Sequence, residues 1–245
     1  GMTENTGPTT IGVANNAAEF ITTKFKANGV KVPKVLNPIG KVGIPIAGTE
    51  VKVLDDGELC QRGNHVSQGY YKAEAETKET FDDDGWLHTG DLAEIDEDGY
   101  VKIIGRKKEI LITSAGKNIA PVEVEDLVKP HPLIGQVCLV GDGKKYLTAL
   151  VVLDGDGGAE KWAEENGVKY DISSMSRDEK VIAAVQDQVD SANSKVAQVQ
   201  QIKKFVILEN EWTDTSGELT PTLKLKRNVI TEKYNEQIEG MYKED

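Results

Sequence analysis

Four short segments of the 245-residue chain combine hydroxyl and charged side chains, and two of them also contain glycine. These segments are residues 2–4, 85–91, 105–121 and 219–227. Carboxylates such as Glu4 and Asp91 accept hydrogen bonds, and carboxylate oxygens are ligands that Mg²⁺ prefers. Arg106 offers a planar fork of donors, and the ammonium group of Lys224 can stabilise a developing negative charge. The residue types therefore suit the binding and reaction of anionic groups.

Each segment also has a purely structural interpretation. Thr3 and Glu4 can be ordinary residues of a terminal loop, and Asp91 can bond the backbone of its own turn. Arg106 can be a solvated surface side chain, and Gly116 a turn glycine with positive φ. A further alternative is one solvated basic face made of Lys203, Lys204, Lys224, Lys226 and Arg227.

The four segments together resemble motifs of the AMP-forming adenylating enzymes, the superfamily of acyl-CoA synthetases, luciferases and peptide-synthetase adenylation domains. The stretch Thr-Pro-Thr-Leu-Lys that ends at Lys224 is most similar to the long-chain fatty acyl-CoA synthetases. The motifs stand in the family's order, and the resemblance covers almost the whole chain. One departure is Leu223, which occupies the position of the family's usual glycine.

Family members are more than twice as long as this chain, and their phosphate-binding loop lies upstream of the matching region. Residues 2–4 begin inside a Tyr-Gly-x-Thr-Glu motif whose tyrosine stacks on adenine. The resemblance therefore implies the C-terminal part of a larger enzyme. The chain alone is not expected to make acyl-AMP.

The resemblance implies a role for each of several residues. Thr3 would contact the α-phosphate of ATP, and Glu4 would hold Mg²⁺. Asp91 would accept hydrogen bonds from the ribose hydroxyls, whereas Arg106 would reach the ribose or a phosphate. Lys108 would be the hinge about which a C-terminal lid domain swings. His88, within the second motif, is expected to be structural.

Two further segments would serve the two half-reactions. The loop with Gly116 and Lys117 would line the tunnel for the pantetheine arm of coenzyme A. Lys224 would be catalytic when the fatty acid carboxylate attacks the α-phosphate, since that step brings two anions together. ATP and a fatty acid would give acyl-AMP and pyrophosphate, and coenzyme A would then yield acyl-CoA and AMP.

Two alternatives to a long-chain fatty acid–CoA ligase remain. One is another acid–thiol ligase or adenylation enzyme of the superfamily, for example one acting on an amino or aryl acid. The other is a non-catalytic, nucleotide-binding lid module. The combination of Asp91, Arg106 and Lys224 disfavours the lid module, and the Thr-Pro-Thr-Leu-Lys form disfavours the other ligases.

The elements that position these residues change in character along the chain. Residues 15–26 have apolar positions at helical spacing. Two hairpins are then expected, over 49–54 and 58–62 and over 92–95 and 100–104, with Asp/Gly turns between their strands. This first half is predicted to be β-rich, and the resemblance implies that it is the end of a large N-terminal domain.

The second half mixes helices and strands. Residues 110–113 are a short apolar run, and Pro121 begins a helix that stops before Pro130. Strands are expected over 134–140, 146–153 and 204–208, and helices over 159–165, 177–199 and 226–242. The prediction is an α+β fold with a β-rich part over 1–105 and a small mixed α+β lid domain over 106–245.

Composition limits the other functions. The formal net charge of −12 argues against nucleic-acid binding by bulk electrostatics. No apolar stretch long enough for a membrane span and no charged-then-apolar leader is found, although peripheral membrane association of the full-length enzyme stays open. Cys60 and Cys138 have no CxxC spacing, which favours reduced thiols in a cytoplasmic protein. The three histidines are too scattered for a zinc site.

Overall fold

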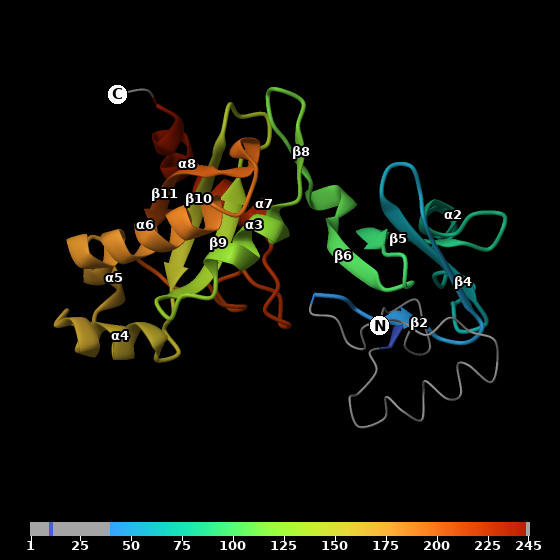
Figure 1. The fold of residues 1–245 in the computed structure, drawn as a ribbon, viewed down its shortest axis with the longest axis horizontal. Helices are drawn as coiled ribbons and strands as arrows, with labels where there is room; N and C mark the ends of the chain where they lie inside the picture. The colour runs from blue at the N-terminus through green and yellow to red at the C-terminus, as the bar shows by residue number, and fades with distance from the viewer. Residues whose placement is uncertain (1–9, 12–39, 244–245) are drawn as a thin grey trace. The chain divides into compact units, whose positions relative to one another are not determined.

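The structure, a computed structural model, describes residues 10–11 and 40–243. Thr3, Glu4 and the helix expected over 15–26 lie outside the described residues. The chain divides into two compact units, Gly1–Lys108 and Glu109–Asp245 (Figure 1). The division falls after Lys108, whereas the boundary expected from the sequence lies after Gly105.

The first unit contains a four-stranded antiparallel sheet whose strands are neighbours in chain order. The strands are β3 (Thr49–Val53), β4 (Glu58–Gly63), β5 (Leu87–Ile95) and β6 (Val101–Arg106). Helix α2 (Glu74–Thr80) connects β4 to β5, and β1 (Thr10–Ile11) pairs with β2 (Ile44–Pro45). Leu59, Ala93 and Val101 form the small core of this sheet. Both expected hairpins are present, and β5 begins earlier than the sequence suggested.

Aspartate and glycine close the two hairpins. The carboxylate of Asp56 accepts the Glu58 N–H at 3.1 Å, and Asp96 accepts the Tyr100 N–H at 2.9 Å. Gly57 and Gly99 have positive φ, which glycine adopts without steric cost. These local bonds set the register of β3–β4 and β5–β6, and so bring Asp91 opposite Arg106.

The second unit is built on the sheet β11-β10-β9. Strands β9 (Ile134–Val140) and β10 (Leu147–Leu153) are antiparallel, and β11 (Ile202–Ile207) is parallel to β10. A short hairpin of β7 (Leu111–Ile112) and β8 (Asn118–Ile119) precedes them. The helices are α3 (Pro121–Val128), α4 (Gly158–Asn166), α5 (Ile172–Met175), α6 (Glu179–Asn193), α7 (Arg227–Lys233) and α8 (Asn235–Tyr242).

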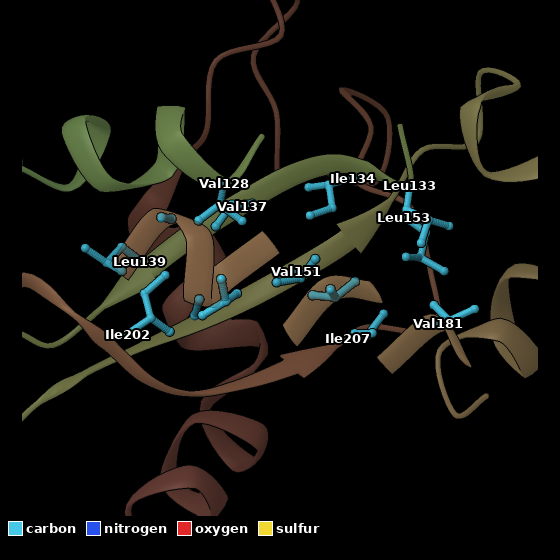
Figure 2. Packing of buried hydrophobic residues seen from close by; sticks show 14 of the residues in the cluster. Val128, Leu133, Ile134, Val137, Leu139, Val151, Leu153, Val181, Ile202 and Ile207 are labelled. Atoms are coloured by element: carbon cyan, nitrogen blue, oxygen red, sulfur yellow. The ribbon is translucent and has the colours of Figure 1, made fainter. Parts of the chain in front are cut away.

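Helices cover both faces of this sheet, so it is buried from two sides. Successive residues of a strand point to opposite faces, and Val137 and Val151 pack with α3 and α6 whereas Cys138 and Leu150 pack with α7 and α8. Figure 2 shows buried residues on the α3 and α6 side of the sheet, among them Val137 and Val151, pointing toward one another from these helices and strands. Burial on both faces explains why every residue of β10 is buried.

Two expected helices differ from the structure. The helix predicted over 177–199 is shorter, because the Asp178 carboxylate caps its start and the Asn193 side chain bonds the backbone of Ile202 instead of continuing the helix. The helix predicted over 226–242 is interrupted at Tyr234, whose hydroxyl donates to the buried Glu218. The α+β fold class is confirmed.

Candidate adenylate-binding and catalytic site

Asp91 and Arg106 form a pair in the first unit. They lie opposite each other on β5 and β6, and Arg106 Nε donates to Asp91 Oδ1 at 2.9 Å. Arg106 is exposed and the Asp91 side chain is half-buried, so both can be reached by a ligand. The structure thus brings together the two residues that the sequence assigned to the nucleotide.

A buried carboxylate, Glu58, lies beside this pair. Glu58 Oε1 accepts the Gly90 N–H at 3.0 Å, and Glu58 Oε2 accepts Lys107 Nζ at 3.0 Å and lies 3.3 Å from His88 Nδ1. Burial raises the pKa of Glu58, but the bonds from Lys107, Gly90 and His88 outweigh it and hold the pKa below its usual value. Glu58 is therefore a charged group inside the sheet.

The histidine of the second motif takes part in the same network. His88 Nε2 lies 3.6 Å from Asp82 Oδ2, and its Nδ1 faces Glu58. These contacts fit the structural role expected for His88.

The linker between the units is tied down on each side of Lys108. Lys107 Nζ pairs with Asp56 at 2.7 Å and with Glu58 at 3.0 Å, both in the first unit, and these bonds raise the pKa of Lys107. Glu109 accepts Arg227 Nε at 3.0 Å within the second unit. Lys108 itself is exposed, in the middle of a 3₁₀ turn over Lys107–Glu109. Short 3₁₀ turns are frequent as connectors between elements.

The β7–β8 hairpin presents the segment with Gly116 and Lys117. Thr113 N–H donates to the Lys117 carbonyl at 3.0 Å and Gly116 N–H to the Thr113 carbonyl at 2.8 Å. Gly116 is exposed with φ +71°, and beyond its own two chain neighbours no atom of the described residues lies within 4 Å of the place where its Cβ would stand. The tip of this hairpin is therefore open around Gly116.

Lys224 is exposed at a tight turn between β11 and α7. Lys224 N–H donates to Thr220 Oγ1 at 3.0 Å, and Thr220 N–H donates to the Lys224 carbonyl at 2.8 Å. The flanking residues Leu219 and Leu225 form an isolated antiparallel β-bridge. Leu223 has φ +59°, the left-handed conformation in which glycine is favoured. Leucine thus occupies a backbone conformation that favours glycine, the residue that the resemblance leads one to expect at this position.

Arg227, three residues later, fixes the base of this turn. It donates to both oxygens of Glu125 at 2.7 Å and to Glu109, and Glu125 also accepts the Leu139 N–H at 2.7 Å. Arg227 is 13% and Glu125 1% exposed. The interpretation of one solvated basic face that included Arg227 is therefore wrong.

Figure 1 shows the β7–β8 hairpin and the red-orange segment between β11 and α7 at opposite ends of the second unit. The hairpin bonds the turn that joins β9 to β10, since Ser114 N–H donates to the Lys144 carbonyl at 2.9 Å. Within this unit, the hairpin that carries Gly116 and the segment that carries Lys224 are therefore separate parts of the fold.

Sequence reasoning missed Glu58 and the Arg227–Glu125 pair. The signal available for Glu58 was a carboxylate at the start of a strand, directly after an Asp-Asp-Gly turn. Arg227 was hidden in a run of basic residues, and only the fold shows that it is buried.

Metal and membrane features of the described chain are few. Over residues 10–11 and 40–243, no group of three or more His, Cys, Asp or Glu side chains is arranged to hold a metal ion. The Mg²⁺ ligand suggested by the sequence, Glu4, lies outside these residues. In the same part of the chain no helix is both long enough and apolar enough to cross a bilayer.

Comparison with known proteins decides the family. A family model described as the AMP-binding enzyme C-terminal domain matches residues 108–245, which is more than half of the chain. The chain belongs to the AMP-binding enzyme family. The matched region begins at Lys108, beside the division between the two units.

Curated members of the AMP-binding enzyme family share substantial identity with the chain. The long-chain-fatty-acid–CoA ligase FadD15 of Mycobacterium tuberculosis is 43% identical over 209 residues, which is 84% of this chain and 34% of that protein. The long-chain-fatty-acid–CoA ligase ACSBG2 of Xenopus laevis is 36% identical over 267 residues, 100% of this chain and 33% of that protein. The chain therefore spans about a third of the length of these relatives.

Solved structures of this family share the fold. The adenylation domain of a carboxylate reductase from Mycobacterium chelonae has a TM-score of 0.65 at 22% identity, covering 83% of this chain and 32% of that one. The O-succinylbenzoate–coenzyme A synthetase of Bacillus subtilis, solved with AMP, has a TM-score of 0.62 at 22% identity, covering 93% and 39%. These neighbours confirm the expected family fold.

Proposed function

We propose that this chain is the C-terminal part of an AMP-forming long-chain fatty acid–CoA ligase. The observation that carries the proposal is the exposed Lys224 on a turn closed by Thr220 and fixed at its base by the Arg227–Glu125 pair. A lysine that is merely solvated at the surface needs no such support. An ammonium group that must meet a reacting phosphate needs a turn that is held in place. The identity of 43% to a named fatty-acid ligase supports the same substrate class.

In the proposed first half-reaction, Asp91 accepts hydrogen bonds from the ribose hydroxyls of ATP. Arg106, paired with Asp91 Oδ1, orients that carboxylate and offers its remaining N–H groups to the ribose or phosphate. Lys224 Nζ contacts the carboxylate and α-phosphate oxygens while acyl-AMP and pyrophosphate form. Thr3 would contact the α-phosphate, and Glu4 would hold the Mg²⁺ that screens the phosphate charge.

In the proposed second half-reaction, the second unit turns about Lys108 and Lys224 leaves the adenylate. The β7–β8 hairpin then presents Gly116 and Lys117 to the pantetheine arm of coenzyme A. The open space around Gly116 supports the proposal that one domain serves two steps. The separation of the β7–β8 hairpin from the segment that carries Lys224 supports it as well. We assign residues 109–245, which follow the proposed hinge, to this lid. We place the enzyme in the cytoplasm, where the free, buried Cys60 and Cys138 would stay reduced.

The test uses the full-length protein. ATP–pyrophosphate exchange with palmitate should be robust, exchange with benzoate should be weak, and the 245-residue chain alone should show background exchange. Lys224→Ala should reduce exchange by about 10²–10³, because it removes charge stabilisation from the reacting centre. Thioester formation from synthetic palmitoyl-AMP and coenzyme A should be largely retained.

The matched control is Lys226→Ala, a change of the same size two residues away that should leave exchange within about threefold of wild type. Equal losses of both half-reactions in Lys224→Ala would contradict the catalytic role and indicate a role in folding. Stronger exchange with an aryl or amino acid than with palmitate would indicate that the chain belongs to another class of ligase. No exchange with any acid would favour the non-catalytic lid.

A further inference from the structure

Glu58 is a carboxylate whose burial the core does not require. Its side chain is 8% exposed, at the first position of β4. Removing a charge from water is unfavourable, and a buried charge persists in proteins only where partners compensate it. The partners of Glu58 therefore indicate what the residue does.

Those partners are neighbours of the nucleotide-binding pair in sequence. Gly90, whose N–H donates to Oε1, directly precedes Asp91, and Lys107, whose Nζ donates to Oε2, directly follows Arg106. Because Asp91 and Arg106 face each other across β5 and β6, a single side chain holds both strands beside that pair.

The bond to Gly90 also fixes the direction of the following peptide. Gly90 has φ +70°, a left-handed conformation inside β5, and the register of β4 and β5 shifts between the pairs Glu58–Leu92 and Cys60–His88, which flank it. A backbone of this kind needs a fixed partner for its N–H if the next side chain is to keep one orientation. Glu58 is that partner.

The need to neutralise Lys107 does not explain why the carboxylate of Glu58 is buried. Asp56 already pairs with the same ammonium at 2.7 Å from an exposed position, where the ion pair needs no buried charge. The bond to the uncharged Gly90 amide does nothing for Lys107.

We infer that Glu58 is a positioning residue for the nucleotide: it holds Gly90 and Lys107 so that Asp91 and Arg106 meet the ribose in one arrangement. The inference rests on the proposed function, because it needs Asp91 to bind ATP. Glu58 makes no contact with substrate itself, so its loss acts on the affinity for ATP and not on the chemical step.

The experiment measures steady-state adenylation by the full-length enzyme with Glu58→Gln. The amide keeps the size of the side chain and can still accept from Gly90, but it presents an NH₂ group or a neutral oxygen to Lys107 and His88. The KM for ATP should rise about tenfold, which matches the smaller effects seen when a metal-binding side chain loses its supporting hydrogen-bond partner. At saturating ATP, kcat and the KM for palmitate should stay within about twofold of wild type.

A double-mutant cycle tests whether Glu58 acts through the pair. With Asp91→Ala in place, adding Glu58→Gln should change the KM for ATP by less than about twofold, since coupled residues are not additive. The matched control is Glu50→Gln on the neighbouring strand β3, whose carboxylate pairs with Arg62 at 2.8 Å and is exposed. This control should leave the KM for ATP unchanged.

Lys107→Gln is a second variant for the case that Glu58→Gln does not fold, and it should raise the KM for ATP about threefold. Additive effects of Glu58→Gln and Asp91→Ala would overturn the inference, as would a KM within twofold of wild type in a folded single variant. Either result with an active wild-type enzyme refutes only this inference. Absence of exchange by the wild type refutes the proposed function instead.

Discussion

The buried pair of Arg227 and Glu125 offers a quantitative test of what holds the second unit together. Replacing Arg227 with methionine removes three charged hydrogen bonds and leaves a carboxylate 1% exposed, with the Leu139 N–H as its remaining partner in the described chain. Breaking a buried ion pair from one side costs about 3–5 kcal/mol, because the other charge stays buried without compensation. Unlike an exposed lysine, Arg227 is thus expected to matter for stability.

The expected change in melting temperature follows from that free energy. At roughly 3 °C per kcal/mol for a domain of this size, a loss of about 4 kcal/mol lowers the melting temperature by about 12 °C. Thermal unfolding of the 245-residue chain, followed by circular dichroism in the far ultraviolet, measures this shift in the transition of the second unit.

Two companion variants separate the charge from the packing. Glu125→Gln combined with Arg227→Met removes both charges and keeps an acceptor for Leu139 N–H, so the double variant should regain at least half of the lost stability. Asp126→Asn on the same helix breaks an exposed pair with Lys129 and should change stability by less than about 0.5 kcal/mol. An Arg227→Met variant that melts within about 3 °C of wild type would refute the reasoning, since it would mean that the buried Glu125 needs no partner.

Three more outcomes are expected. Lys108→Pro in the full-length enzyme should slow thioester formation more than adenylation in single-turnover measurements, because proline fixes φ at the hinge; wild-type rates for both steps would exclude Lys108 as the pivot. Leu223→Gly should leave the melting temperature within about 2 °C of wild type, because relief of the left-handed strain at φ +59° offsets the added flexibility of the unfolded chain. A melting temperature lowered by more than about 5 °C would show that the side chain of the exposed leucine makes stabilising packing contacts. Burial raises the pKa of Cys60 to about 11 and of Cys138 to about 12, so neither thiol should react with a disulfide reagent at pH 8 until urea unfolds the chain. Rapid labelling of the native chain would contradict this. Because the thiols of the unfolded chain lose their protons at lower pH, the free energy of unfolding should fall as the pH rises from 9.0 toward 11.

The hairpins were predictable because their determinants lie within a few residues. Asp56 and Asp96 accept backbone N–H groups two and four residues ahead, and glycine supplies the positive φ of each turn. The helix from Pro121 and the strand over 134–140 were likewise found from local breakers and apolar runs. Asp91 and Arg106 could be named from their motifs, and their pairing follows from the register of β5 and β6.

What escaped prediction depends on partners distant in the sequence. The break at Tyr234 reflects a bond to the buried Glu218, and the end of α6 reflects bonds from Asn193 to the backbone of Ile202. Glu58 acquires its role from residues that lie 32 and 49 positions away. No periodicity or turn rule carries such information, since it arises only when the strands are placed side by side.

The anchoring of the linker has a consequence for motion between the units. Lys107 is tied to Asp56 and Glu58, and Glu109 is tied to Arg227, so Lys108 is the residue between the two anchors. A peptide chain has two soft dihedral angles per residue, which leaves reorientation about this joint with few degrees of freedom. In contrast to a flexible tether, whose ends search a volume that grows with its length, such a joint would move the second unit along a narrow path. For the two half-reactions of the proposed function, the conformational search would then be short, and little entropy would be lost when either arrangement is reached.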